Sequence, residues 1–207
     1  MTVYKRDTDY HTYADYLVLS ATYGDELIDG TAYIREPRSP TWVHQEFVGA
    51  LGFQIANALK GKPCHVYFVP LDVRLPKASE EDDQIDTIVQ PDVFIVCDPE
   101  KLDERGVCGA PDWLAEVLSP ATACHDQVVK LPAYERAGVR EVWLIHPDDQ
   151  VLTIYRLEGG RYGRPTHLEL KGQTQLTAVP GVIVDWDEMM AGISCGVSAH
   201  GGRPRST

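Results

Sequence analysis

The chain has 207 residues, which is enough for one well-buried domain and leaves little for a second. Its composition, 43% hydrophobic and 24% charged, is ordinary for a globular protein, and no run of 18 apolar residues suggests a membrane span. The net charge of −12 argues against avid nonspecific nucleic-acid binding, which depends on Lys and Arg neutralising phosphates.

The acidity is uneven along the chain. Residues 119–171 hold seven basic and seven acidic side chains, so the acidic excess lies mainly in residues 1–118. A weak or guided contact with nucleic acid therefore stays compatible with the composition. The five cysteines are odd in number and form no CxxC pair, and the first residues lack an apolar signal core. We therefore expect reduced thiols and a cytoplasmic location.

Residues 1–25 are rich in Tyr and Asp, and we interpret them as an irregular or weakly helical N-terminal extension. The segment 26–34 predicts two short strands that turn at Asp29-Gly30, a dipeptide typical of tight hairpins. A breaker, residues 37–40, with proline at both ends, follows. The predicted main domain therefore begins at residue 26.

Apolar residues at helical spacing predict a helix over residues 43–59. Thr41 suits its N-cap, and Gly61 suits the position just past its end. Gly49 and Gly52 lower the helix propensity, so we expect close packing of this helix on a sheet.

Glu46 lies at the edge of the apolar face of this helix. It is either a solvated flank residue or a carboxylate that reaches over the sheet toward a central site. His44 has the same ambiguity, and we favour a capping or hydrogen-bonding role for it over metal ligation.

The next segments predict a strand over residues 64–75 and an exposed acidic loop over residues 77–86. Two nearly continuous apolar runs, 93–97 and 113–118, predict central strands that are buried on both faces.

A second helix is predicted over residues 126–137, before Gly138. Asp126, Lys130 and Tyr134 are spaced at i, i+4 and i+8, so they share one helix face. Pro132 lies within this range, so the helix is either kinked there or begins later.

The remainder predicts a β-meander, a last short strand and, from residue 192, a flexible tail. One α+β domain, residues 26–191, accounts for these elements. Its strands are expected at residues 141–146, 151–156, 162–170 and 182–186.

Two carboxylates resist a purely structural explanation. Asp92 stands directly before an apolar strand, and Glu116 interrupts the apolar run Trp113–Leu118. A buried carboxylate without a partner is costly, so Glu116 needs a cation, and both a metal ion and a lysine would serve. A neighbouring arginine or backbone donors would satisfy Glu116 equally well without any function. The dipeptide Pro-Asp is common and is weak evidence by itself.

Carboxylate oxygens from adjacent strands suit a hard cation such as Mg²⁺ or Mn²⁺, which keeps several waters and accepts a phosphate oxygen. A nearby lysine could hold the attacking water while the metal polarises the phosphoryl group. Together these features predict a phosphodiesterase.

The order Pro91-Asp92, Glu116 within an apolar strand and then Lys130 resembles the PD-(D/E)XK nuclease superfamily. More closely, the chain resembles a bacterial family of restriction-endonuclease-like proteins, abundant in cyanobacteria. The similarity spans roughly residues 20–190 and is most specific over residues 110–143.

The resemblance implies a mixed β-sheet flanked by helices and a metal-dependent DNA endonuclease. Asp92, Glu116 and the backbone carbonyl of Val117 would hold Mg²⁺ or Mn²⁺, with Glu46 as a further ligand or water contact. The superfamily lysine would stand two positions after Glu116, where this chain has leucine. In the resembling family the following helix carries the lysine, which here is Lys130.

Three hypotheses follow from the sequence. The first is a Mg²⁺-dependent DNA endonuclease, for which a homodimer would suit two cuts on antiparallel strands. The second is a nuclease-like fold that serves as a binding or regulatory module without catalysis. The third is a glycosidase with a carboxylate pair, which ranks lowest because the chain shows no aromatic-rich groove segment.

Overall fold

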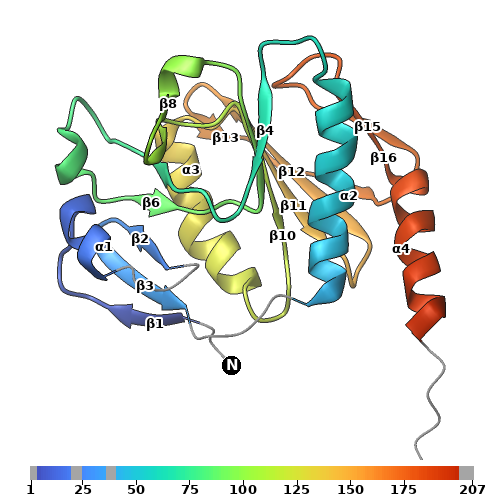
Figure 1. Ribbon diagram of the computed structural model, residues 1–207, viewed down its shortest axis with the longest axis horizontal. Coiled ribbons are helices and arrows are strands. Elements are labelled where there is room, and N and C mark those ends of the chain that lie inside the picture. Colours follow the sequence, from blue (N-terminus) through green and yellow to red (C-terminus); the bar gives the residue numbers. More distant parts are fainter. Residues whose placement is uncertain (1–3, 20–24, 36–40, 201–207) are drawn as a thin grey trace, which may run out of the picture.

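The computed structural model describes residues 4–19, 25–35 and 41–200. The chain folds as a mixed α+β structure around a seven-stranded central sheet (Figure 1). The strands of this sheet are β4 (His65–Phe68), β7 (Val93–Val96), β10 (Trp113–Val117), β11 (Glu141–His146), β12 (Val151–Glu158), β13 (Arg161–Tyr162) and β14 (Thr166–Glu169). Their order is β13-β12-β11-β10-β7-β4, with β14 beside β12, so β10 is central.

A second seven-stranded sheet, in the order β1-β3-β2-β6-β5-β9-β8, lies against one side of the first. Its strands are β1 (Tyr4–Asp7), β2 (Glu26–Ile28), β3 (Thr31–Arg35), β5 (Val73–Arg74), β6 (Ile88–Val89), β8 (Leu102–Asp103) and β9 (Gly106–Cys108). A separate pair consists of β15 (Gln173–Gln175) and β16 (Ile183–Asp185).

The helices cover both faces of the central sheet. In Figure 1, α2 and α4 lie on one side and α3 on the other. The helices are α1 (Tyr13–Leu19), α2 (Trp42–Ala58), the π-helical turn η3 (His125–Lys130), α3 (Leu131–Ala137) and α4 (Trp186–His200), with short 3₁₀ turns η1 (Asp82–Gln84) and η2 (Pro99–Lys101). None of the described helices is long and apolar enough to cross a membrane.

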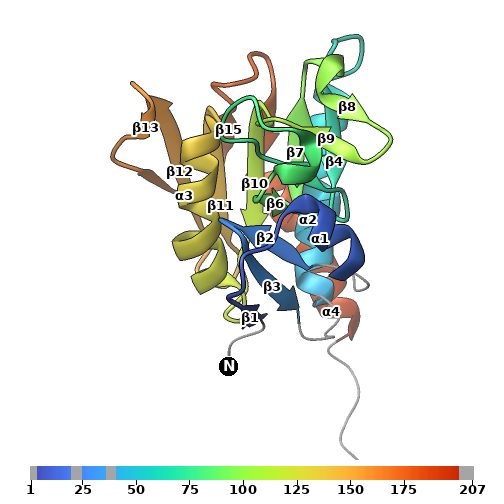
Figure 2. The ribbon, with the colours of Figure 1, turned by 90° about the vertical axis from the view of Figure 1, so that its left-hand side faces the viewer.

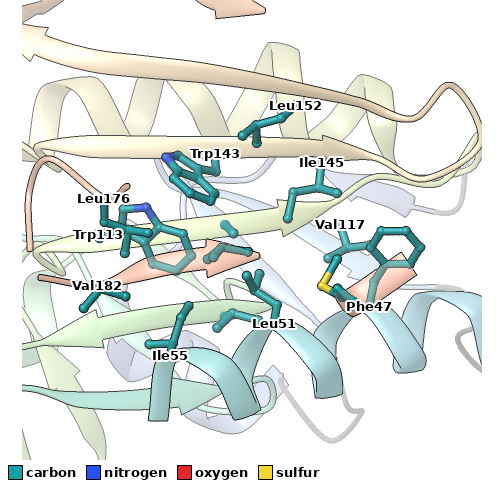
Figure 3. Packing of buried hydrophobic residues seen from close by; sticks show 14 of the residues in the cluster. Phe47, Leu51, Ile55, Trp113, Val117, Trp143, Ile145, Leu152, Leu176 and Val182 are labelled. Carbon is teal, nitrogen blue, oxygen red and sulfur yellow. The ribbon is translucent and has the colours of Figure 1, made fainter. Parts of the chain in front are cut away.

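The central strands are buried on both faces, as their apolar runs predict. Alternate side chains enter two different clusters, because the side chains of a strand alternate between its faces. Trp113 and Val117 of β10 face α2 (Figure 3), whereas Leu114 faces the side of α3. This alternation places Glu116 on the α3 side.

The predicted hairpin and first helix are confirmed. The turn between β2 and β3 has positive φ angles at Asp29 and Gly30. Thr41 caps α2 by accepting a hydrogen bond from the backbone N–H of His44 at 3.2 Å. A Cβ on Gly52 would collide with the ring of Phe68, so close packing explains this glycine.

Several local predictions are wrong. Nothing lies near a Cβ built on Gly49, so packing does not explain that glycine. The strand expected over residues 64–75 is two strands, β4 and β5, in different sheets, because the chain turns at Pro70 between them. Residues 4–7, expected to be irregular, pair with β3. The backbone from residue 192 to residue 200, expected to be a tail, continues α4.

The expectation of reduced thiols is also wrong for one pair. Cys64 and Cys97 form a disulfide, while Cys108 and Cys124 are free. Cys64 directly precedes β4 and Cys97 directly follows β7, and these antiparallel strands pair His65 with Val96. The two cysteines are therefore cross-strand neighbours although 33 residues separate them. The predicted breaker at residues 37–40 and the end of the chain lie outside the described residues.

A fully buried carboxylate, Glu141, fastens the segment before β16 to the central sheet. It accepts hydrogen bonds from Trp143 Nε1 at 2.6 Å, from the backbone N–H groups of Thr177 at 2.8 Å and Ala178 at 2.9 Å, and from the Thr177 hydroxyl. Four donors saturate the oxygens of one carboxylate, which explains how the charge is tolerated.

Replacing Glu141 with alanine will leave these buried donors without an acceptor. We expect Glu141→Ala to lower the free energy of unfolding by about 3–5 kcal/mol, measured by urea denaturation. The matched change at the exposed end of β12, Glu158→Ala, should shift it by no more than about 0.5 kcal/mol. If Glu141→Ala lowers the free energy of unfolding by less than about 1 kcal/mol, Glu141 does not hold this segment to the sheet.

Candidate functional site

Asp92 and Glu116 are side by side on the α3 face of the central sheet. Strands β7 and β10 pair Val93 with Ala115, and one step further the same register sets Asp92 opposite Glu116. The backbone N–H of Asp92 lies 3.4 Å from Glu116 Oε2. The register of two buried strands thus brings together two carboxylates that are 24 residues apart.

Lys130, the last residue of the π-helical turn η3, contacts Glu116. Its Nζ lies 2.7 Å from Glu116 Oε1 and 3.6 Å from Asp126 Oδ1. The Tyr134 hydroxyl donates a hydrogen bond to the same Glu116 oxygen. The shared helix face predicted from the i, i+4, i+8 spacing is therefore confirmed.

The regular α-helix begins later than residue 126, which is one of the two outcomes predicted from Pro132. The chain forms a π-turn before it, in which the backbone N–H of Leu131 donates to the carbonyl of Asp126. α3 then starts with Pro132 in its first turn, where a missing N–H costs least. Gly138 ends the helix in the left-handed conformation with φ 87°, as expected.

Glu26 is a third buried carboxylate that the sequence did not reveal as part of the site. Its oxygens lie 3.1 Å from Lys130 Nζ and 2.7 Å from His125 Nε2, and it accepts from the backbone N–H of Gln90 at 2.9 Å. In the sequence it stands at the start of a short hairpin strand, with nothing to relate it to residues 90–130. Only the pairing of β2 with β6 brings it there.

Asp92 is held by two donors. The backbone N–H of Val117 donates to Asp92 Oδ2 at 2.8 Å, and His44 Nε2 lies 3.1 Å from the same oxygen. The N–H and C=O of one residue in an extended strand point to the same side, so the Val117 carbonyl also faces β7. His44 therefore has the hydrogen-bonding role expected for it.

The structure does not bring Glu46 to the other predicted site residues. Glu46 is exposed, whereas His44 lines the cavity between Asp92 and Lys130. His44 and Glu46 are two positions apart, which separates them by about 200° around the helix axis, so only one of the two can face the cavity. The reading of Glu46 as a solvated flank residue agrees with this position.

The site residues surround a cavity of about 30 Å³, which has room for one water or one small ion. Three of its polar atoms are buried without a hydrogen-bond partner among the described residues: Arg35 Nε, His44 Nδ1 and Gln90 Oε1. Four of the lining side chains are carboxylates and two are the basic groups of Arg35 and Lys130.

The excess of carboxylates perturbs their protonation. Burial raises the pKa of Glu116, and the nearby Asp126 and Asp92 raise it further, against the opposing effect of Lys130. Burial likewise raises the pKa of Asp126. Burial alone would raise the pKa of Glu26, but Lys130 and the hydrogen bond from His125 lower it to about 2. One lysine therefore keeps Glu26 ionised, while Glu116 and Asp126 favour a proton or a further cation.

Lys130 stays charged. Burial would lower its pKa, but Glu116 and Glu26 raise that pKa well above the ordinary value. Within the described residues, no three His, Cys, Asp or Glu side chains are already grouped to hold a metal ion. Lys130 and the Val117 N–H occupy oxygens that a cation would need.

Comparison with known proteins identifies the family. A family model described as "Uma2: Putative restriction endonuclease" matches residues 12–187. The chain belongs to the Uma2 family. The family resemblance inferred from the sequence is thereby confirmed, while no curated protein matches the Uma2 chain.

A solved structure has the same fold as this Uma2 protein. It is described as "a putative nuclease belonging to DUF820 from Anabaena variabilis ATCC 29413" and matches with a TM-score of 0.66 at 20% identity. The match covers 88% of the Uma2 chain and 98% of the other chain. It shows that the two proteins share the mixed sheet with flanking helices.

The raised pKa of Glu116 makes a prediction about stability in metal-free buffer. The pKa of Glu116 is about 4.5 in the unfolded state and is raised in the folded state. Between these two pKa values, Glu116 carries a proton only when the protein is folded. The stability contributed by protonated Glu116 is therefore lost as the pH rises from about 5 upward. Glu116→Gln mimics the protonated form, so the variant should gain stability relative to wild type by at most about 1.4 kcal/mol per pH unit.

Urea denaturation of both proteins from about pH 5 to pH 8 measures this difference. Glu26 does not interfere, because its pKa of about 2 confines its effect to lower pH. Glu158→Gln, measured over the same pH range, shows how much the loss of an exposed carboxylate changes the free energy of unfolding. A difference that is constant with pH would show that Glu116 is ionised throughout.

Proposed function

We propose that the chain is a metal-dependent endonuclease that hydrolyses phosphodiester bonds in DNA. The observation that carries this proposal is the meeting of Asp92, Glu116 and Lys130 at one cavity. Their order along the chain is that of PD-(D/E)XK nucleases, with the lysine supplied by the helix after the second carboxylate strand. Membership of the Uma2 family supports the same assignment.

The donor set fits a hard divalent cation, Mg²⁺ or Mn²⁺. Asp92 and Glu116 would supply carboxylate oxygens and Val117 its backbone carbonyl, and such oxygens are the ligands these ions prefer. The surplus of buried negative charge favours the fit, because burial and the neighbouring carboxylates raise the pKa of Glu116 and a bound cation would compensate this charge. When bound, the ion would polarise the scissile phosphoryl group and lower the pKa of a bound water.

The side chains around the cavity have distinct roles in this proposal. Lys130 remains protonated, so it orients the attacking water and stabilises negative charge but does not accept a proton. Glu26 and Asp126 fix its position. Arg35 lines the cavity and makes no ion pair with a described carboxylate, so its guanidinium is available to the phosphate. His44 orients Asp92.

Plasmid nicking in Mg²⁺ or Mn²⁺ tests the proposal. We expect Asp92→Asn, Glu116→Gln and Lys130→Met each to lower the nicking rate by at least about 100-fold, because each removes a group that acts on the phosphate or the water. Glu46→Gln should stay within about twofold of wild type, since Glu46 is exposed outside the cavity.

Glu158→Gln serves as a surface control for these variants, and thermal unfolding checks that each variant is folded. Chelation with EDTA should abolish nicking by the wild type. Equal nicking by wild type and the three site variants would indicate a contaminant and overturn the assignment. A large loss in Glu46→Gln would return that residue to the site.

The alternative is a nuclease fold that binds partners without catalysis. One observation favours it: Lys130 already forms an ion pair with Glu116, so a metal must compete for that oxygen. Calorimetric titration with Mn²⁺ separates the two proposals. For the nuclease we expect one binding event that Asp92→Asn weakens at least tenfold and Glu158→Gln leaves unchanged. Absence of binding to wild type would favour the inert module.

The homodimer and the cytoplasmic location inferred from the sequence stay predictions. The cytoplasmic location was inferred partly from reduced cysteines, and the disulfide between Cys64 and Cys97 removes that part of the argument.

A further inference from the structure

Two arginines and two tyrosines alternate on one face of the β1–β3 ribbon. Tyr4 is the register partner of Arg35, and Arg6 is the partner of Tyr33. Residues two apart on a strand project to the same side, and cross-strand partners share that side, so all four side chains face one way. Basic side chains interleaved with aromatic rings are typical of surfaces that bind single-stranded nucleic acid.

This face borders a cavity of about 220 Å³ beside the start of the helix η3–α3. The ribbon lies next to this end of the helix in both ribbon views (Figures 1 and 2). The cavity reaches the surface at Cys124, which is exposed, and at Val128, which is 65% exposed. Its walls are otherwise formed by Tyr4, Arg6, Tyr33, Pro120, Ala121, His125 and Val129. Since an apolar cavity of about 150 Å³ accepts benzene, this one has room for a nucleobase.

Aromatic rings form the floor of the cavity. The rings of Tyr4 and His125 stack with centroids 4.0 Å apart, and Tyr33 lies 4.7 Å from His125. The Arg6 guanidinium lies 5.6 Å from the centre of the Tyr33 ring. These rings are held in place by one another, so little side-chain entropy is lost when a further ring packs against them.

The cavity adjoins the proposed catalytic site. Tyr4 lines both cavities, and His125 contacts Glu26, which in turn contacts Lys130. Arg35, two residues after Tyr33 on β3, lines the catalytic cavity. Adjacent side chains on one face of a strand are about 7 Å apart, so a phosphate at Arg35 leaves its base within reach of Tyr33.

We propose that this cavity binds an unpaired nucleobase next to the phosphate that is cut. The inference rests on the proposed nuclease function and narrows its substrate to nucleic acid with a single-stranded, flapped or bulged nucleotide at the cleavage position. A base within a duplex is stacked and paired, so it cannot enter a side cavity without being flipped out at a cost. Stacking also supplies affinity that does not depend on a broad basic surface, which a chain of net charge −12 lacks.

Fluorescence anisotropy in EDTA, where no cleavage occurs, tests the inference. The probes are a labelled single-stranded oligonucleotide, the duplex of the same sequence, and a deoxyribose-phosphate chain of the same length without bases. We expect the single strand to bind about tenfold more tightly than both other probes. Equal affinity for the base-free chain would show that only phosphates are contacted and would overturn the base site.

Two pairs of matched variants locate the binding. Val128→Glu places a charge at the mouth of the cavity, while Val18→Glu makes the same change at a residue that is 83% exposed on α1. Arg6→Gln removes the cation beside Tyr33, and Arg105→Gln removes an exposed arginine from the far end of the second sheet. We expect five- to tenfold weaker single-strand binding for Val128→Glu and Arg6→Gln only. Equal effects within either pair would overturn the location.

A measurement on the unmodified chain complements the variants. Alkylation of Cys124, at the rim of the cavity, should slow severalfold when the single strand is bound, while alkylation of Cys108 on β9 should not change. Peptide mass spectrometry reads the two thiols separately. Unchanged reactivity of Cys124 at saturating single strand would count against the cavity.

The outcomes also separate this inference from the proposed function. Single-strand binding that depends on Val128 and Arg6, together with no cleavage in Mg²⁺ or Mn²⁺, would support the base site and reject the nuclease. Cleavage without preference for unpaired nucleotides would support the nuclease and reject the base site.

Discussion

A single ammonium group, that of Lys130, lies among three buried carboxylates, Glu26, Glu116 and Asp126. Burying one unpaired charge costs several kcal/mol, and here the charges come from three distant parts of the chain. β2 delivers Glu26, β10 delivers Glu116 and the helical turn η3 delivers the other two. The positions of these three elements therefore depend on one another. The second sheet, the central sheet and the helix meet where their charges compensate.

The geometry of the helix that carries Lys130 follows from a local constraint. Pro132 has no N–H, and its absence costs least in the first turn of an α-helix, which is where α3 places it. Before α3 the chain forms a π-turn that closes between Leu131 and Asp126. Wider helical turns of this kind are frequent at functional sites. Here the turn buries Asp126 and Lys130 side by side.

The parts of the site that the sequence predicts are those encoded by short-range patterns. An acid within an apolar strand identified Glu116, and helical spacing identified the face that holds Lys130. Glu26 could not be found in this way, because its role arises from the pairing of β2 with β6, about 60 residues away. Glu46 and His44 illustrate a different limit. Both stand near the edge of one apolar helix face, and only the rotation of α2 on the sheet decides which enters the cavity.

The fold shows a similar division. Continuous apolar runs predicted the central strands β7 and β10, and the Asp29-Gly30 turn predicted the β2–β3 hairpin. The Cys64–Cys97 bond required knowledge of the register between β4 and β7. Likewise, the strand β1 has no strong pattern of its own. It forms because β3 offers it an edge, so its pairing is tertiary information.

Charge is the property for which local and global descriptions differ most. The net charge of −12 would repel a polyanion at long range, yet salt screens exposed charges beyond about 8–10 Å. Five of the 31 acidic residues lie in residues 80–86, where Asp82 forms ion pairs with Arg74 and Arg105. The face formed by β1 and β3 instead presents Arg6 and Arg35 with Tyr4 and Tyr33 between them. A nucleic acid that reaches this face meets local positive charge and aromatic rings. An acidic protein can therefore hold an unpaired nucleotide here by contacts that a count of charges along the sequence does not reveal.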